Sequence, residues 1–426
     1  MLGSNNSRSP RIMMYSQDGF GLGHMRRTTS IARQILSTRP DACVLTVADS
    51  RLGQFFETMP HQDYIKLPSV VKVGPGAWRA VDMPLPFDEV HAMRQDLIRS
   101  AVLTFRPHVL LVDHMPHGAM GELLPALSAL KASGADTQVV LGLRDILDAP
   151  EVVQQRWQLE GAYDAIERYY DKVLVYGERQ IYDMATHYHL SSAIVSRLRY
   201  TGYICTPDQA RYPARARAKY LANAAPETKL IVVMAGGGAD AYPMMRACLD
   251  ALPAIRAQQP VAMMLNTGPF MPTELRRDLQ TRARGIPGVH VAISVNDTLS
   301  YLEAADLVVA MCGYNTTMEL LRSGRPAILI PRAGPSAEQR TRAQLFAEQG
   351  WVKMLDPDDS DPDLLAEMAL ASLRGDHPAP IGSRPNLQGL TTATNELLDF
   401  LPRVQDADEQ IMPLTIGPLR QPVVVA

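Results

Sequence analysis

The chain has 426 residues, more than one hydrophobic core usually serves, so we expect two domains. Its 46% hydrophobic and 20% charged residues are typical of a globular protein, and a net charge of −3 argues against a general nucleic-acid-binding surface. Four widely separated cysteines form no CxxC pair and no Cys/His cluster, which argues against a disulfide framework or a zinc site.

The N-terminal segment lacks the apolar stretch of a secretory signal, and the chain contains no run of about 18 apolar residues. We therefore expect a cytoplasmic protein with no transmembrane segment. A peripheral location at the membrane is compatible with this pattern, because a protein without a spanning helix can still bind lipid-linked molecules from the membrane surface.

Apolar runs rich in β-forming residues alternate with segments of helical spacing. In the first half, the predicted strands span residues 11–16, 42–48, 108–113, 138–143 and 172–176. A Pro- and Arg-rich segment follows residue 203, and further predicted strands span residues 229–234, 261–266, 289–293, 306–311 and 326–331. This alternation predicts βαβ units, parallel sheets and two successive doubly wound α/β halves.

The same pattern predicts the domain organisation. We expect an N-terminal domain over residues 1–205, a linker over 206–225, a C-terminal domain over 226–385, and a C-terminal helix and tail over 386–426. Ligands of doubly wound sheets bind at the carboxyl ends of the strands, so the predicted sites lie in the loops that follow them.

A glycine-rich loop, residues 17–26, follows the first predicted strand. Gly19 and Gly21 fit the dinucleotide fingerprint, but the third glycine position is His24, so the fingerprint fails. A histidine at this position can remove a proton from a hydroxyl group near neutral pH. The alternative is a histidine that caps or packs locally.

A second glycine-rich loop, residues 235–242, opens the second half. Gly236 and Gly237 allow a ligand, such as a phosphate, to approach the backbone closely. A flexible turn without a ligand would have the same composition.

The third loop, residues 311–320, carries the most specific signal. Gly313 permits a turn, Asn315 and Thr316 are expected to cap the following helix, and free N–H groups at its start can bind a diphosphate. Glu319 can accept hydrogen bonds from two sugar hydroxyls, and Glu338 and Gln339, in a later loop, are suited to the same task. The alternative is a capped packing helix followed by a surface loop.

Residues 306–343 resemble the donor-binding segment of the GT-B glycosyltransferases. The stretch MCGYNTTMEL is similar to the HCGWNSTLE core of the plant secondary-product enzymes, and also to the peptidoglycan N-acetylglucosaminyltransferases, so that families 28 and 1 are both implied. The resemblance implies a GT-B fold, in which two Rossmann-like domains face a cleft. It also implies a nucleotide-diphosphate sugar as donor substrate, with no cofactor and no metal.

The resemblance assigns roles to individual residues. The diphosphate would be bound by Gly313, Asn315 and Thr316, and the ribose by Glu319. The transferred sugar would be bound by Gln339 and Glu338, and the base by backbone atoms of Val295. His24, in GLGHMRR, would be the catalytic base. Because the plant enzymes orient this histidine with an aspartate of the first domain, Asp113 is the candidate partner, while His114, His117 and Asp145 lie on comparable strand ends.

Three residues depart from the family pattern. Met311 replaces a histidine that contacts phosphate, Glu338 replaces an aspartate, and Arg340 stands where the peptidoglycan enzymes have a second glutamine. The donor sugar and base are therefore left open.

The resemblance implies an inverting glycosyltransferase that transfers a sugar, UDP-linked by analogy, to a lipid-linked or small-molecule acceptor. One alternative is a nucleotide-sugar hydrolase of the same fold, because GLGHMRR also resembles the GxGHxxR loop of the UDP-sugar hydrolases of pseudaminic acid synthesis. A nucleotide-sugar epimerase and a non-catalytic nucleotide-sugar-binding protein are further alternatives. A first domain of about 200 residues, with long loops for an acceptor, favours the transferase.

Overall fold

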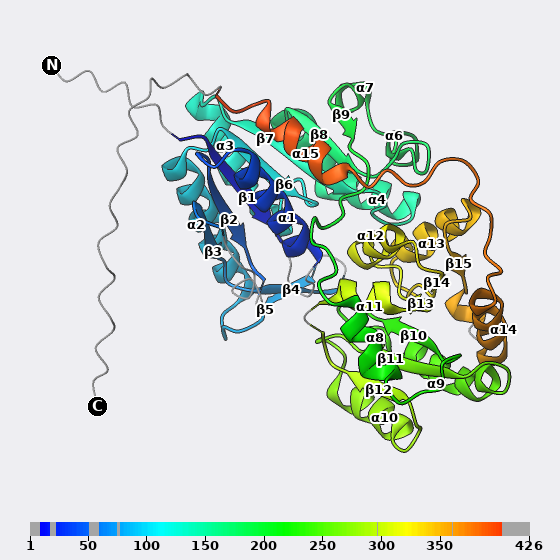
Figure 1. The fold of residues 1–426 in the computed structure, drawn as a ribbon. Helices are drawn as coiled ribbons and strands as arrows, with labels where there is room; N and C mark the ends of the chain where they lie inside the picture. Colours follow the sequence, from blue (N-terminus) through cyan, green and yellow to red (C-terminus); the bar gives the residue numbers. More distant parts are fainter. Residues whose placement is uncertain are drawn as a thin grey trace, which may run out of the picture.

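Two parallel sheets, one in each half of the chain, form the framework of the computed structural model, which describes residues 9–17, 23–50, 59–74, 77–295, 297–359 and 361–402 (Figure 1). The first sheet has the strand order β3-β2-β1-β6-β7-β8-β9 and the second the order β12-β11-β10-β13-β14-β15. This confirms the predicted α/β class, with two doubly wound Rossmann-like domains.

The ten predicted strands are all present, and their bounds agree with the prediction to within two residues at each end. The first sheet contains β1 (Arg11–Ser16), β2 (Cys43–Ala48), β3 (Gln62–Lys66), β6 (Val109–Asp113), β7 (Gln138–Arg144), β8 (Lys172–Tyr176) and β9 (Leu198–Tyr200). The second contains β10 (Lys229–Met234), β11 (Val261–Asn266), β12 (Val289–Ala292), β13 (Leu307–Ala310), β14 (Ala327–Leu329) and β15 (Lys353–Met354). Strands β3, β9 and β15 were not predicted, and neither was a separate antiparallel hairpin of β4 (Val70–Gly74) and β5 (Ala77–Ala80).

Helices follow most of the strands. Those of the first half are α1 (Gly23–Thr38), α2 (Phe87–Phe105), α3 (Leu124–Ser133), α4 (Pro150–Glu160), α5 (Ala162–Tyr169), α6 (Met184–His187) and α7 (Ser192–Val195). Those of the second half are α8 (Pro213–Leu221), α9 (Tyr242–Arg256), α10 (Thr273–Ala283), α11 (Thr298–Ala304), α12 (Tyr314–Ser323), α13 (Glu338–Glu348) and α14 (Pro362–Leu373). Helix α8 lies within the predicted linker and packs against α11.

The last helix, α15 (Gly389–Leu398), belongs spatially to the first domain. Figure 1 shows the chain leaving α14 and returning across the molecule to this helix, drawn in orange-red. Helix α15 packs against α1 and β8, and Gln388 forms a β-bridge with Ile204. The C-terminal segment therefore ties the second domain back onto the first.

Side-chain alternation along each central strand explains why helices cover both faces of each sheet. In β1, Ile12 and Met14 join the core formed with α1 and α15, whereas Met13 and Tyr15 join the core formed with α2, α3 and α5. All four side chains are fully buried. A strand buried on both faces must be apolar at every position, which is why these strands were visible as continuous apolar runs.

Each of the two sheets contains a topological switch point in its strand order. In the first sheet the order reverses between β1 and β6, and in the second it reverses between β10 and β13. Ligands of open α/β sheets bind in the crevice that a switch point leaves at the carboxyl ends of its strands. The three loops singled out in the sequence follow β1, β10 and β13.

Candidate functional site

A cleft of about 1050 Å³ lies between the two domains and is lined by both switch points. The predicted site residues that line it are His24, Gly236, Gly237, Val295, Gly313, Asn315, Thr316, Glu338 and Gln339. Asp113 lies directly behind His24, and Glu319 lies in a small adjoining cavity. Gly19 and Gly21 lie outside the described residues.

The first-domain side of the cleft carries His24 and Asp113. His24 is the second residue of α1, and its Nδ1 lies 2.6 Å from Oδ2 of Asp113, the last residue of β6. The histidine side chain is 18% exposed, whereas the aspartate is 1% exposed. The hydrogen bond to Asp113 orients the imidazole and leaves Nε2 as the nitrogen that can accept a proton.

Arg27 completes this cluster, although the sequence analysis did not assign it. Its Nη2 lies 2.8 Å from each oxygen of Asp113 and 2.9 Å from His24 Nδ1. Burial alone would raise the pKa of Asp113, but the charges of Arg27 and His24 hold that pKa below its ordinary value. Asp113 is therefore a carboxylate at neutral pH.

His114 lies beside this cluster, with its ring centroid 5.1 Å from that of His24. Burial, together with the charges of Arg144 and His24, holds the pKa of His114 well below its ordinary value. The imidazole is consequently neutral near pH 7. Its Nδ1 has no hydrogen-bond partner among the described residues, which leaves a polar atom for a bound molecule to satisfy.

On the second-domain side, α12 begins at the cleft. The helix starts at Tyr314 with Gly313 as N-cap, and no side chain caps it, so the expected capping by Asn315 and Thr316 was wrong. Asn315 instead donates a hydrogen bond to the backbone oxygen of Gly23 at 3.1 Å, across the domain boundary. The first N–H groups of an α-helix have no partner within the helix, so this uncapped start can bind an anion.

Glu319 lies one turn further into α12 and is buried. Its Oε1 lies 2.6 Å from Arg26 of α1, and its Oε2 has no hydrogen-bond partner within the described part of the chain. Burial raises the pKa of Glu319, although the charge of Arg26 opposes that shift. A buried carboxylate oxygen without a partner is costly, and a ligand hydroxyl would satisfy it.

Glu338 and Gln339 begin α13 and differ in their partners. Glu338 accepts hydrogen bonds from Arg144 of the first domain at 2.9 and 3.0 Å and from Arg342 at 2.8 Å. Burial would raise the pKa of Glu338, but both arginines hold it below its ordinary value. Gln339 accepts a 3.3 Å hydrogen bond from the backbone of Arg332.

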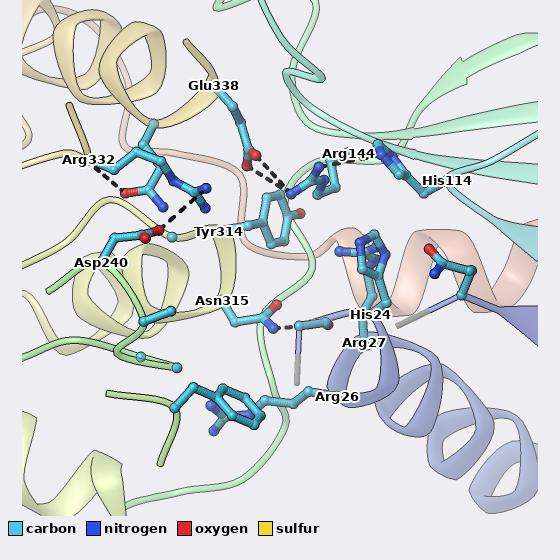
Figure 2. A pocket seen from close by; sticks show the side chains of 18 of the residues that line it. His24, Arg26, Arg27, His114, Arg144, Asp240, Tyr314, Asn315, Arg332 and Glu338 are labelled. Carbon is cyan, nitrogen blue, oxygen red and sulfur yellow. Dashed lines mark hydrogen bonds and ion pairs between the residues drawn. The ribbon is translucent and has the colours of Figure 1, made fainter. Parts of the chain in front are cut away.

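Figure 2 shows Arg144 between Glu338 and His114, with Arg332 close to Asp240 at the other side of the cleft. Four arginines that were not singled out from the sequence also line the cleft: Arg26, Arg27, Arg144 and Arg332. The spacing of His24 and Arg27 carried a usable signal, because residues three apart lie on the same helix face. The interdomain contacts of Arg26 and Arg144 had no local signal.

The glycine-rich loop after β10 approaches the loop after β11 very closely. Gly238 has a φ of 92°, and a Cβ there would lie 1.9 Å from the backbone oxygen of Thr267. Only glycine fits this position. The tight packing places the backbone of Gly236 and Gly237 at the cleft wall beside the start of α12.

Two Rossmann-like domains that face a shared cleft define a protein of the GT-B class. Residues 231–386 match the glycosyltransferase family 28 C-terminal domain. The chain is 22% identical over 375 residues to the UDP-N-acetylglucosamine–N-acetylmuramyl-(pentapeptide) pyrophosphoryl-undecaprenol N-acetylglucosamine transferase of Bacteroides thetaiotaomicron, covering 83% of this chain and 87% of that protein. The chain is a glycosyltransferase of GT-B fold, similar to those of families 28 and 1.

Solved structures agree with the fold. MurG of Acinetobacter baumannii superposes with a TM-score of 0.55 at 14% identity, covering 92% of this chain and 99% of that one. The UDP-GlcNAc 2-epimerase of Methanocaldococcus jannaschii superposes with a TM-score of 0.58 at 10% identity, covering 91% and 99%. Since a transferase and an epimerase both match, the structural likeness establishes the fold alone.

Proposed function

We propose that this enzyme transfers a sugar from a UDP-linked donor to an acceptor hydroxyl, with inversion and without a bound metal. The observation that carries the proposal is the position of the His24–Asp113 pair next to the start of α12, where Asn315 contacts the residue preceding His24. A proton acceptor and an anion-binding helix start thus share one cleft. The Bacteroides relative is named as a UDP-N-acetylglucosamine-dependent transferase, which supports the choice of donor.

The donor diphosphate would bind at the start of α12. Its negative charge would be stabilised by the uncapped N–H groups and the helix dipole. Arg26 and Arg332 line the same cleft and would add positive charge, which is the role a divalent cation would otherwise fill. The unpartnered Oε2 of Glu319 would accept a ribose hydroxyl while Oε1 keeps its contact with Arg26.

The chemical step follows from this arrangement. Nε2 of His24 takes the proton of the acceptor hydroxyl as the acceptor oxygen attacks the anomeric carbon. The bond between that carbon and the diphosphate breaks, and UDP leaves with the electron pair. Attack from the side opposite the leaving group inverts the anomeric configuration. Asp113 holds the imidazole through Nδ1 throughout, and Arg27 holds Asp113.

The acceptor would have an apolar part, because apolar side chains line the first-domain side of the cleft. They are Val70, Val71, Trp78, Met120, Leu124, Trp157 and Leu159. Leu159 and Met120 are 79% and 46% exposed, so this wall continues to the surface. A lipid-linked acceptor fits this wall. Among the described helices, none is long and apolar enough to cross a bilayer.

A panel of nucleotides and nucleotide sugars, tested for thermal stabilisation, would identify the donor. Binding to the folded state stabilises it by RT ln(1 + [L]/Kd), so the melting temperature rises with the logarithm of ligand concentration once that exceeds Kd. UDP and at least one UDP-sugar should stabilise the protein more than the matching ADP and GDP compounds. Stabilisation by none of the nucleotides would contradict the proposal.

A nucleotide-sugar hydrolase is the second candidate, favoured by Arg27. The hydrolase-like GxGHxxR pattern includes this arginine, and the structure places it on the His24–Asp113 pair. Incubation with donor alone separates the two functions. A transferase should release free sugar slowly and should be accelerated by acceptor, whereas a hydrolase would work at full rate without one.

Glu319→Ala is expected to weaken nucleotide binding by one to two orders of magnitude, because it removes charge-assisted hydrogen bonds to the ribose worth roughly 1.5–3 kcal/mol. Calorimetry with UDP would measure the change. Glu303→Ala, on the neighbouring α11, removes an exposed glutamate as the matched control and should leave the affinity unchanged. Equal affinities for the Glu319 variant and the wild type would remove the ribose assignment.

Asn315→Leu is expected to weaken UDP binding far more than uridine binding, because the bulky side chain would obstruct the helix start where the diphosphate binds. Parallel calorimetric titrations with UDP and uridine would measure the difference. Equal losses for both ligands would show that Asn315 only shapes the loop through its contact with Gly23.

A further inference from the structure

Arg27 is 2% exposed, although its helix begins at the cleft. It is bound to both oxygens of Asp113 and lies 2.9 Å from His24 Nδ1. Burial opposes its charge, but Asp113 keeps the pKa of Arg27 above its ordinary value. The guanidinium is therefore a fixed part of the cluster that holds the proton acceptor.

The same guanidinium also packs against two tyrosine rings. Its Cζ lies 5.3 Å from the ring centroid of Tyr176 and 5.7 Å from that of Tyr314. Tyr176 ends β8 in the first domain, whereas Tyr314 is the first residue of α12, directly after Gly313. Arginine can do both tasks at once, since its planar fork binds a carboxylate while its faces stack on aromatic rings.

Tyr314 is enclosed by the first domain, although it belongs to the donor-binding helix. Its hydroxyl donates a 2.9 Å hydrogen bond to the backbone oxygen of Tyr176 and accepts one of 2.8 Å from the backbone N–H of Ile204. The side chain is 5% exposed, and Figure 2 shows it in the middle of the cleft residues.

A second buried arginine holds the same ring. Cζ of Arg342, from α13, lies 5.5 Å from the ring centroid of Tyr314. Arg342 is bound to Asp145, which follows β7, and to the backbone oxygen of Cys312, which precedes the donor helix. Two arginines, each paired with an aspartate at the end of a neighbouring strand, thus fix the position of one ring.

We propose that Tyr314 and Arg27 are positioning residues that connect the donor-binding helix to the proton acceptor, so that nucleotide binding at the start of α12 orients His24. This inference rests on the proposed function for the identity of the nucleotide. In this closely packed cluster a shift of Tyr314 would displace Arg27. A shift of Arg27 would move Asp113, which it binds, and with it His24, which Asp113 orients.

Nuclear magnetic resonance of protein labelled with 13C at histidine Cε1 tests the connection, with the His24 signal assigned by its loss in His24→Gln. Without ligand, Tyr314→Leu should move the His24 signal, whereas Tyr314→Phe, which keeps the ring, should leave it near its wild-type position. Saturating UDP should then shift the His24 signal in the wild type and in Tyr314→Phe. In Tyr314→Leu the UDP-induced shift of the His24 signal should be less than half of the wild-type shift.

Two further variants keep the test decisive. Arg27→Lys retains the positive charge but loses the planar guanidinium that stacks on the tyrosine rings. Its UDP-induced shift of the His24 signal should be reduced in the same way, even if Tyr314→Leu does not fold. Tyr220→Leu removes a tyrosine of similar burial that contacts Tyr301 in the second domain, and it should respond like the wild type. A His24 signal that responds equally in all variants would overturn the inference.

Steady-state kinetics provide a measurement that would not change if Tyr314 had a purely structural role. With the donor identified by the nucleotide panel, Tyr314→Leu should lower kcat by about 10²-fold, the loss expected when a catalytic group is displaced by about 1 Å. The donor KM should change less than threefold. If the wild type binds no UDP, the proposed function fails, while the ligand-free comparison still decides whether Tyr314 positions His24.

Discussion

His24→Ala is expected to lower turnover by about 10²–10⁴-fold, the usual loss when a general base is removed. The imidazole is the only group of its cluster that is partly exposed to the cleft, at 18%, while Asp113 behind it is 1% exposed. The residues proposed to bind the diphosphate and the sugars, such as Asn315, Glu319 and Gln339, lie on the other domain. Calorimetry should therefore show UDP affinity close to that of the wild type, so that the loss appears in kcat.

His187→Ala is the matched control for this substitution. His187 lies on α6 of the same domain, stacked on Tyr182 at a centroid distance of 4.2 Å, and it does not line the cleft. Its removal should leave turnover unchanged. Undiminished activity in His24→Ala would exclude this histidine from the mechanism, for a transferase and for a hydrolase alike.

The sequence predicted the central strands well because their environment imposes a simple pattern. Strands such as β1 and β10 are buried on both faces, so every position is apolar and the run is continuous. Strand β3, with the sequence QDYIK, lies at the edge of its sheet and is partly exposed, so it carries no such run. The β4–β5 hairpin was missed for a similar reason, because β5 alternates between exposed and half-buried positions.

It was predictable that the loops of the candidate site lie together, but the contacts among their residues were not. Loops after β1, β10 and β13 meet because parallel strands bring their carboxyl ends to one edge, which is also why Asp113 lies beside His24. The ion pairs of Glu319 and Glu338 join residues of different domains, which no local pattern encodes. Both glutamates were predicted as ligand-binding groups, and that assignment stays a prediction.

These interdomain pairs involve side chains to which a role in donor binding is assigned. Glu319 contacts Arg26, Glu338 contacts Arg144, and Asn315 contacts Gly23. Three polar groups assigned to the donor are thus already bound by the first domain. A donor that enters the cleft would exchange at least some of these contacts for its own, so binding and the relative position of the domains are energetically coupled.

Arg342→Met is expected to destabilise the protein by about 3–5 kcal/mol, the cost of leaving a buried charge without its partner. Arg342 is fully buried, and it binds Asp145 at 2.6 and 2.8 Å and Glu338 at 2.8 Å. Methionine would fill much of the volume but would leave Asp145 uncompensated. Denaturant unfolding, monitored by tryptophan fluorescence, would measure the loss.

An exposed ion pair provides the matched control. Arg179 is 71% exposed and pairs with Asp183 at 3.2 Å, so Arg179→Met should cost less than about 1 kcal/mol. The double variant Arg342→Met with Asp145→Leu should recover part of the loss, because it removes the uncompensated carboxylate together with its partner. If Arg342→Met costs no more than Arg179→Met, the buried pair does not stabilise the contact between the domains. A large loss that the double variant relieves would show that Asp145, at the end of β7, is the group that Arg342 neutralises.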